Sequence, residues 1–200
     1  MKRVISIILT LTLFIFAAVC IARETLDEEL EIYDKTLRLH IPANSNSKED
    51  QAVKLEVRDA VLKLLEKPLA ECENKAEAIA VVQNMTEDIT KEANKVLIKN
   101  KKEYKAKVSV VEEYYPEKAY DGLDLPAGTY SSLKIELGKA QGENWWCVLF
   151  PQVCVGTAKP EEALAEVGFT ANQIRLLTDH EDYEYVVKFK LVEIIDSIFG

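Results

Sequence analysis

The strongest constraint on the fold is a change in the spacing of apolar residues near residue 100. Between Val53 and Leu97 the apolar residues recur every three to four positions, which is the period of an amphipathic helix. From Val108 to Leu137 they alternate, which is the period of a half-buried strand. A shorter alternating segment, "TLRLHIP", comes before the helical part. The order strand, helices, strands predicts an α+β fold.

The predicted helices have recognisable starts and stops. "ANSNSKED" is a polar turn in which Ser47 and Asp50 have the spacing of a capping box. The first helix is predicted to run to about Leu65 and to end at Pro68. A second, longer helix is expected at 75–99. A short helix is predicted in "KPEEALAEVGF", with proline near its first turn and glycine at its stop.

Three further strands are predicted in "AKVSVVEEYYP", "TYSSLKIELG" and "NWWCVLF", separated by the turn-rich "DGLDLPAG" and the hairpin-like "GKAQGE". Residues 183–191 alternate as a strand, and "LVEIIDSIF" returns to helical spacing. We expect one α+β domain over residues 23–200. Its antiparallel or mixed sheet would have about four to five strands, with two long helices packed on it.

The N-terminus predicts export. Lys2 and Arg3 precede 18 residues, Val4 to Ile21, that carry no charge. This is the pattern of a Sec-type signal peptide or of an uncleaved signal anchor. Eighteen residues are at the lower limit for spanning the hydrocarbon core, so length leaves cleavage open. We expect cleavage after Ala22 and a membrane association through this segment alone.

The rest of the chain gives no sign of catalysis. A net charge of −9 argues against nucleic acid as a partner. The sequence has no nucleophile elbow, metalloprotease helix or phosphate-binding glycine loop. His40, on the polar side of its strand, is expected to be exposed or to cap, and His180 lies in an acidic run without the EF-hand pattern. We predict no catalytic residue, no metal site and no cofactor.

The cysteines acquire a role if the chain is exported. Cys147 and Cys154 enclose a short loop that contains Pro151, and disulfides persist outside the cytoplasm. A disulfide between them would add roughly 2–2.5 kcal/mol to the free energy of unfolding by the loop-entropy estimate. Zinc is disfavoured because no second cysteine pair or nearby histidine completes a site. Cys72 is predicted to be an inert free thiol.

The segment "NWWCVLF" has two interpretations. Trp145 and Trp146 alternate on a strand, so at least one of them should face the core. The other tryptophan, with Leu149 or Phe150, would offer an apolar anchor to a partner protein, because aromatic residues dominate interface hot spots. A second candidate contact surface is the strand face of Arg38 and His40. It would continue into the polar turn, where Asn44 lies.

Two segments, "LRLHIPANSNSKEDQAVKLEVRDAVL" at 37–62 and "LPAGTYSSLKIELGKAQGENWWCVLFPQVC" at 125–154, closely resemble the stage II sporulation protein R family. With the export signal and the "VKFKLVEIIDSIF" tail, the resemblance spans nearly the whole chain. It implies a signalling protein of endospore-forming bacteria, exported from the forespore into the space between forespore and mother cell.

By this resemblance the protein would trigger a membrane-embedded aspartic protease of the mother cell, which matures pro-sigma-E. It would be a ligand without chemistry of its own. Two other classes stay open: an envelope-associated hydrolase, and an extracellular protease inhibitor or scaffold. A hydrolase would need a pocket with a perturbed acid or nucleophile. An inhibitor would lower proteolytic processing, whereas an activator would raise it.

Overall fold

The computed structural model describes residue 5 and residues 9–16, 31–120, 122–153 and 159–178. The chain divides into two units, of which one is Tyr33–His180 and the other comprises Met1–Ile32 with Glu181–Gly200. In the second unit residues 9–16 are helical. Among the described residues, no helix combines the length and the apolar character needed to cross a bilayer.

The larger unit is built on a mixed sheet of four strands in the order β2-β5-β1-β6. β1 runs parallel to β5, whereas β6 pairs antiparallel with β1 and β2 pairs antiparallel with β5. β1 is central because all but one of its residues are buried, which requires a neighbour on each side. The four strands are β1 (Leu37–Pro42), β2 (Ala106–Tyr115), β5 (Gly128–Leu137) and β6 (Asn144–Phe150).

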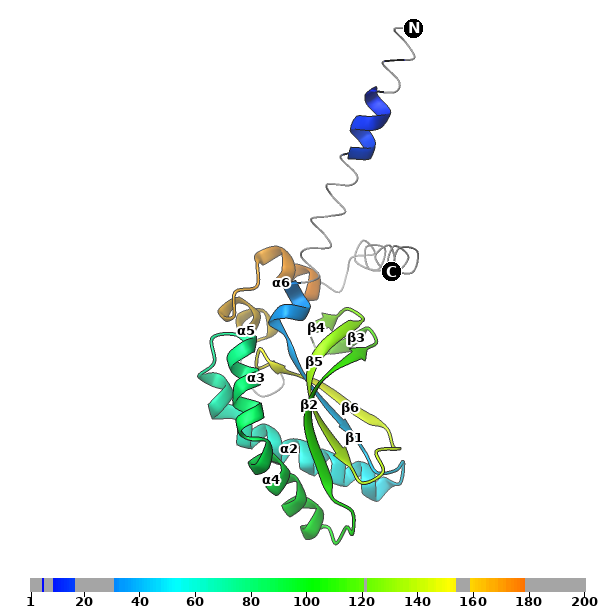
Figure 1. Ribbon diagram of the computed structural model, residues 1–200, viewed down its shortest axis with the longest axis vertical. Helices are drawn as coiled ribbons and strands as arrows, with labels where there is room; N and C mark the ends of the chain where they lie inside the picture. Colours follow the sequence, from blue (N-terminus) through cyan, green and yellow to red (C-terminus); the bar gives the residue numbers. More distant parts are fainter. Residues whose placement is uncertain (1–4, 6–8, 17–30, 121, 154–158, 179–200) are drawn as a thin grey trace. The chain divides into compact units, whose positions relative to one another are not determined.

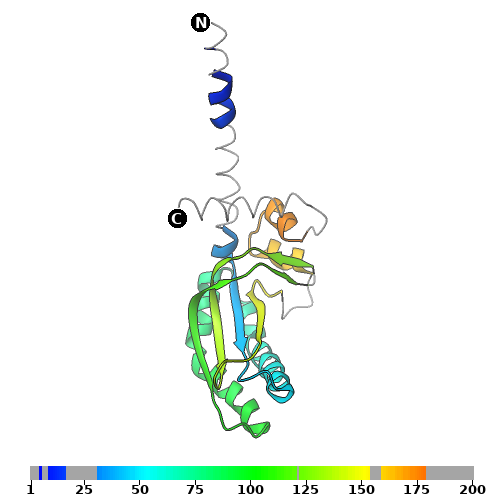
Figure 2. The same ribbon diagram turned by 90° about the vertical axis from the view of Figure 1, so that its right-hand side faces the viewer.

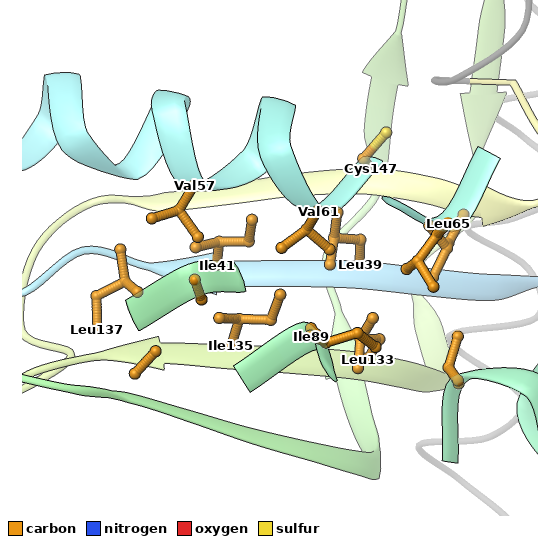
Figure 3. Packing of buried hydrophobic residues seen from close by; sticks show 14 of the residues in the cluster. Leu39, Ile41, Val57, Val61, Leu65, Ile89, Leu133, Ile135, Leu137 and Cys147 are labelled. Atoms are coloured by element: carbon orange, nitrogen blue, oxygen red, sulfur yellow. The ribbon is translucent and has the colours of Figure 1, made fainter. Parts of the chain in front are cut away.

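Three helices cover one face of this sheet: α2 (Lys48–Ala70), α3 (Lys75–Asn84) and α4 (Thr86–Lys99) (Figure 1). The core lies between these two layers, and Leu39, Ile41, Val57 and Val61 meet there, each 0% exposed (Figure 3). Because the side chains of a strand alternate, the same arrangement turns Arg38 and His40 to the opposite face. The α+β class predicted from the sequence is therefore confirmed.

The two long helices were predicted with wrong ends. α2 continues through Pro68 to Ala70, because a proline in the last turn removes only one intrahelical hydrogen bond. The predicted single helix at 75–99 is two helices that meet at Met85. There the Thr86 hydroxyl donates to the Val82 and Gln83 carbonyl oxygens, at 3.1 and 2.8 Å, in competition with the regular helical bonds.

Only one of the two hydrogen bonds of the predicted capping box forms at the start of α2. Ser47 accepts a hydrogen bond from the Asp50 backbone N–H at 3.1 Å, which makes it the N-cap. The Asp50 carboxylate does not return this bond. It accepts instead from side chains of other elements, which are described with the site below.

Two connections differ from the prediction. "DGLDLPAG" contains β4 (Leu123–Leu125), which forms a separate antiparallel hairpin with β3 (Lys118–Tyr120). "GKAQGE" does not close a hairpin, because β1 lies between β5 and β6. The unpredicted hairpin lies at the end of the sheet near α5 and α6 (Figures 1 and 2).

The segment after β6 holds two short helices, α5 (Pro160–Glu166) and α6 (Ala171–Thr178). α5 begins at Pro160, and Gly168 follows it with φ +82°, as the sequence predicts. α6 was not predicted, although Thr170 and Gln173 form a reciprocal capping box before it.

Several predictions fall outside the described residues. These are the signal residues Lys2, Arg3 and Ala22, Cys154, and the strand and helix expected after residue 182. The described helical stretch at 9–16 lies within the predicted apolar signal segment. Export, cleavage and the boundary at residue 22 stay predictions.

Candidate interaction face

The face of the sheet opposite the helices, which we name the Arg38 face, carries a cluster of aromatic and charged side chains. It takes Arg38 and His40 from β1. The pairing registers place Ser132 and Lys134 of β5 beside these two residues, and Trp146 of β6 beside His40. Since paired residues point to the same side of a sheet, the cluster follows directly from the strand order.

Arg38 lies at the buried end of this face with 0% exposure, although the sequence predicts a polar strand face there. Its guanidinium carbon is 4.1 Å from the ring centroid of Tyr115 and 4.8 Å from that of Tyr130. Its Nη2 donates to the Tyr120 hydroxyl at 2.5 Å. Such cation–π contacts and the weak hydration of guanidinium favour arginine here over lysine.

The remaining donors of Arg38 are unpaired within the described chain: Nε and Nη1 are buried and have no hydrogen-bond partner there. Burial raises the pKa of Tyr115 and of Tyr120, so both phenols stay neutral beside the cation. Arg38 was predicted as a partner contact. In this conformation it is a buried support under the face and offers no surface to a partner.

His40 and Glu113 form the polar centre of the face. His40 Nδ1 is 3.0 Å from Glu113 Oε1, and Nε2 is 2.9 Å from Asn144 Oδ1. Lys134 Nζ donates to Glu113 Oε2 at 2.9 Å. Burial alone would raise the pKa of Glu113, but hydrogen bonds from His40, Lys134 and Ser132 lower it to about 2. Glu113 is therefore ionised at neutral pH.

The two tryptophans point to opposite faces, as their alternation predicts. Trp145 packs against the hydrophobic core, and the guanidinium carbon of Arg58 lies 4.3 Å from its ring centroid. Trp146 lies half-buried on the Arg38 face, with its ring centroid 5.8 Å from that of His40 and 5.9 Å from that of Tyr115. Of the two, Trp146 is the one whose ring lies on the Arg38 face.

Leu149 and Phe150 were proposed as possible anchors beside the exposed tryptophan. The structure places both in the hydrophobic core, at 0% and 2% exposure. An irregularity in the β1–β6 register between Leu37 and Arg38 shifts the pairing at this end of β6, where Leu37 faces Phe150. Neither residue offers an anchor in this conformation.

Asn44 belongs to a structural corner beyond the end of β1. Its Nδ2 donates to Asp50 Oδ2 at 2.8 Å, and its Oδ1 accepts from the Lys139 backbone N–H at 3.0 Å. Asp50 is 5% exposed and also accepts from Ser45, Lys102 and Tyr104. Burial opposes ionisation of Asp50, but these hydrogen bonds hold its pKa well below the ordinary value. The corner joins three loops around the buried Asp50 carboxylate, and the half-buried Asn44 supports the fold there.

The polar side chains at the centre of the Arg38 face bond to one another. Both ring nitrogens of His40 are occupied by side chains of the protein, so neither is placed to take a proton from a substrate. Within the described residues, no three histidine, cysteine or acidic side chains come together as a metal site. What the face offers is an aromatic ring flanked by His40 and by Lys118, whose Nζ is 5.8 Å from the Trp146 ring centroid.

Comparison with known proteins gives a match to the part of the chain that forms the sheet and its helices. The family model of stage II sporulation protein R matches residues 33–159, which include the whole sheet and its three helices. The chain belongs to the stage II sporulation protein R family. It is 30% identical over 222 aligned residues to the stage II sporulation protein R of Bacillus subtilis (strain 168), and the alignment covers 100% of this chain and 99% of that relative. No solved structure matches it.

The two segments that carry the family resemblance meet in space. The first contributes β1 and the start of α2, and the second contributes β5 and β6. Together they supply Arg38, His40 and Trp146 of the Arg38 face. The partners from the intervening segment, Glu113 and Tyr115, were not predicted. Their only sequence signal was the alternation at the end of "VVEEYY", which puts both on one side of a strand.

Proposed function

We propose that this protein is an exported sporulation signal that activates a membrane-embedded aspartic protease of the mother cell, so that pro-sigma-E is matured. The observation that carries the proposal is membership of the stage II sporulation protein R family, with a relative aligned over the full chain. The uncharged N-terminal segment after Lys2 and Arg3 supports export from the forespore. The protein itself would perform no chemistry.

An activator of this kind works by differential binding. It raises proteolysis only to the extent that it binds the active arrangement of the protease more tightly than the inactive one. The Arg38 face supplies a preorganised contact surface for this purpose, because His40 and Glu113 at its centre are already hydrogen-bonded and the Trp146 ring packs near those of His40 and Tyr115. We assign the centre of the contact to Trp146 and His40.

Export would also give the cysteines a purpose. Cys147 is 1% exposed near the end of β6, and Cys154 follows it after the turn at Pro151. A disulfide between them would hold the end of the strand that presents Trp146. Gln152 supports the same turn, because its Nε2 donates to the Glu66 carbonyl oxygen at 2.7 Å.

The test is a reconstituted membrane that holds the protease and its pro-sigma-E substrate, to which the purified protein is added. The proposal expects precursor cleavage to increase with the concentration of added protein. Trp146→Ala should lower this activation by at least about tenfold in protein that still unfolds cooperatively in urea, because the ring it removes lies on the Arg38 face. Trp145→Ala, the matched variant, should lower the urea midpoint because its ring packs on the core.

Other results would each point elsewhere. A decrease in cleavage would identify an inhibitor. Unchanged cleavage with correctly folded protein would exclude activation. Equal loss of activity in Trp146→Ala and in a variant of the helical side, such as the exposed Leu55→Ala, would remove the Arg38 face from the mechanism while leaving the activator function in place.

A further inference from the structure

β2 leaves one edge of the sheet without a partner strand. Its ten residues pair with β5 on one side in an uninterrupted register, and no strand in the described part of the chain pairs with its other side. Proteins usually protect such an edge with a bulge, a proline, a very short strand or charged side chains, and of these β2 has only the charges of Lys107, Glu112 and Glu113. An edge of this kind is a template for another strand.

The hydrogen bonds around β2 show which of its backbone groups face this edge. The Ala106 N–H donates to the Asn94 side chain at 2.9 Å, away from β5. The preceding residue, Lys105, turns its carbonyl towards β5 and accepts from the Gly138 N–H at 3.0 Å. Because the direction alternates along an antiparallel strand, Val108, Val110 and Glu112 present their N–H and C=O groups to the free edge.

A second copy of β2 fits this edge in one antiparallel register. If a twofold axis passes through Val110, then Val108 lies opposite Glu112 and Lys107 lies opposite Glu113 of the other copy. Lys107 is the only basic residue of β2, and this is the register that sets it against an acidic one. A twofold axis at Glu112 or Glu113 would instead place like charges directly opposite, which destabilises a strand pair.

The same register would bury Tyr114 against the other copy. Tyr114 is 67% exposed on the helical side of the sheet, and in this register it lies opposite Ala106 of the other copy. Beside Ala106 is a hollow of about 320 Å³, lined by residues that include Asn94, Ile98 and Tyr104. Ile98 is itself 74% exposed. The tyrosine ring of each copy would enter the hollow of the other.

We propose that the protein forms a twofold dimer through the free edges of its β2 strands. In it, Val110 meets Val110 on the axis, Lys107 faces Glu113, and Tyr114 enters the hollow beside Ala106. The two four-stranded sheets join into one continuous sheet, and both Arg38 faces lie on the same side of it. This assembly does not depend on the proposed function, although it would present two copies of the contact surface to a twofold partner.

The first test measures the mass of the full-length chain in mild detergent by sedimentation equilibrium. The wild type should reversibly form dimers, and Tyr114→Arg should weaken the dimer by at least about tenfold, because a buried interface aromatic is replaced by a charge. Leu55→Arg is the matched control, since Leu55 is also exposed but lies on α2. Circular dichroism checks that both variants keep the fold.

The second test maps the register with one cysteine introduced at 109, 110 or 111 in a background in which Cys20 and Cys72 are both replaced by serine; the background without the new cysteine is the control. Only the residue on the twofold axis meets its own copy, so mild oxidation should crosslink Val110→Cys into dimers and leave the other two largely monomeric. A monomer at every concentration overturns the dimer. So does a dimer that Tyr114→Arg leaves intact, and crosslinking strongest at 109 or 111 overturns this register.

Discussion

Glu113 is the residue whose charge the Arg38 face depends on, and its stabilising effect can be measured. Its carboxylate is hydrogen-bonded by His40, Lys134 and Ser132, and these bonds lower its pKa from 4.5 to about 2 despite its burial. A carboxyl whose pKa is depressed on folding stabilises the native state above its unfolded pKa. That stabilisation is lost as the pH falls from about 4.5 through about 2.

The size of this stabilisation follows from the change in the pKa of Glu113. A change of this size corresponds to about 3 kcal/mol if it were expressed in full. Because the carboxylate keeps some contact with solvent, we reduce this to about 1–2 kcal/mol. Glu113→Gln keeps the shape of the side chain and removes its charge. At neutral pH the variant should therefore unfold with a free energy lower than the wild type by about 1–2 kcal/mol.

The assay is urea unfolding of wild type and variant at a series of pH values from about 2.5 to about 7. The stability difference should be greatest near neutral pH and should shrink by more than half at the acid end. Glu112→Gln is the matched control, because Glu112 is the exposed neighbour on the other face of β2, and it should change stability by less than about 0.5 kcal/mol. A stability difference between Glu113→Gln and wild type that stays constant over the whole pH range would show that the Glu113 charge does not stabilise the fold.

Three further substitutions test other parts of the structure. Gly138→Ala should lower the free energy of unfolding by more than about 1 kcal/mol, because Gly138 has φ +58° and the new Cβ would collide with the Asn44 side chain; an unchanged urea midpoint would contradict this. Arg38→Met should change the free energy of unfolding by less than about 1 kcal/mol, because the substitution removes the cost of desolvating a charge as well as the contacts with the rings. If calorimetry shows that the variant is less stable by several kcal/mol, the ring contacts dominate. Under oxidising conditions Cys154→Ala should lower the free energy of unfolding by about 2 kcal/mol, and a reductant should destabilise the wild type but not the variant. Equal stability of the two proteins under both conditions would exclude the disulfide.

The parts of the fold that the sequence predicts are those set by local periodicity. Alternation located β1, β2, β5 and β6, and the Ser47 cap located the start of α2. Strand order was not predictable in the same way. Whether β6 pairs with β5 or with β1 depends on which strand is buried on both sides, and this is a property of the assembled sheet.

In the candidate site, too, the features set by local strand geometry were predictable and those set by the assembled sheet were not. Opposite directions for Trp145 and Trp146 follow from strand geometry alone. The burial of Arg38 does not, because it depends on tyrosines from β2, β3 and β5 that are far apart in sequence. A charged residue on a strand ordinarily indicates a solvated face. Here three aromatic rings replace the solvent.

The proposed function requires the Arg38 face to be the surface that meets the partner. The most direct measurement is oxidative labelling of the two tryptophans, read by mass spectrometry, in the free protein and in its complex with the protease. Trp146 should lose reactivity on binding, while Trp145 should keep the reactivity it has in the free protein. Unchanged labelling of Trp146 in a complex that activates cleavage would contradict it.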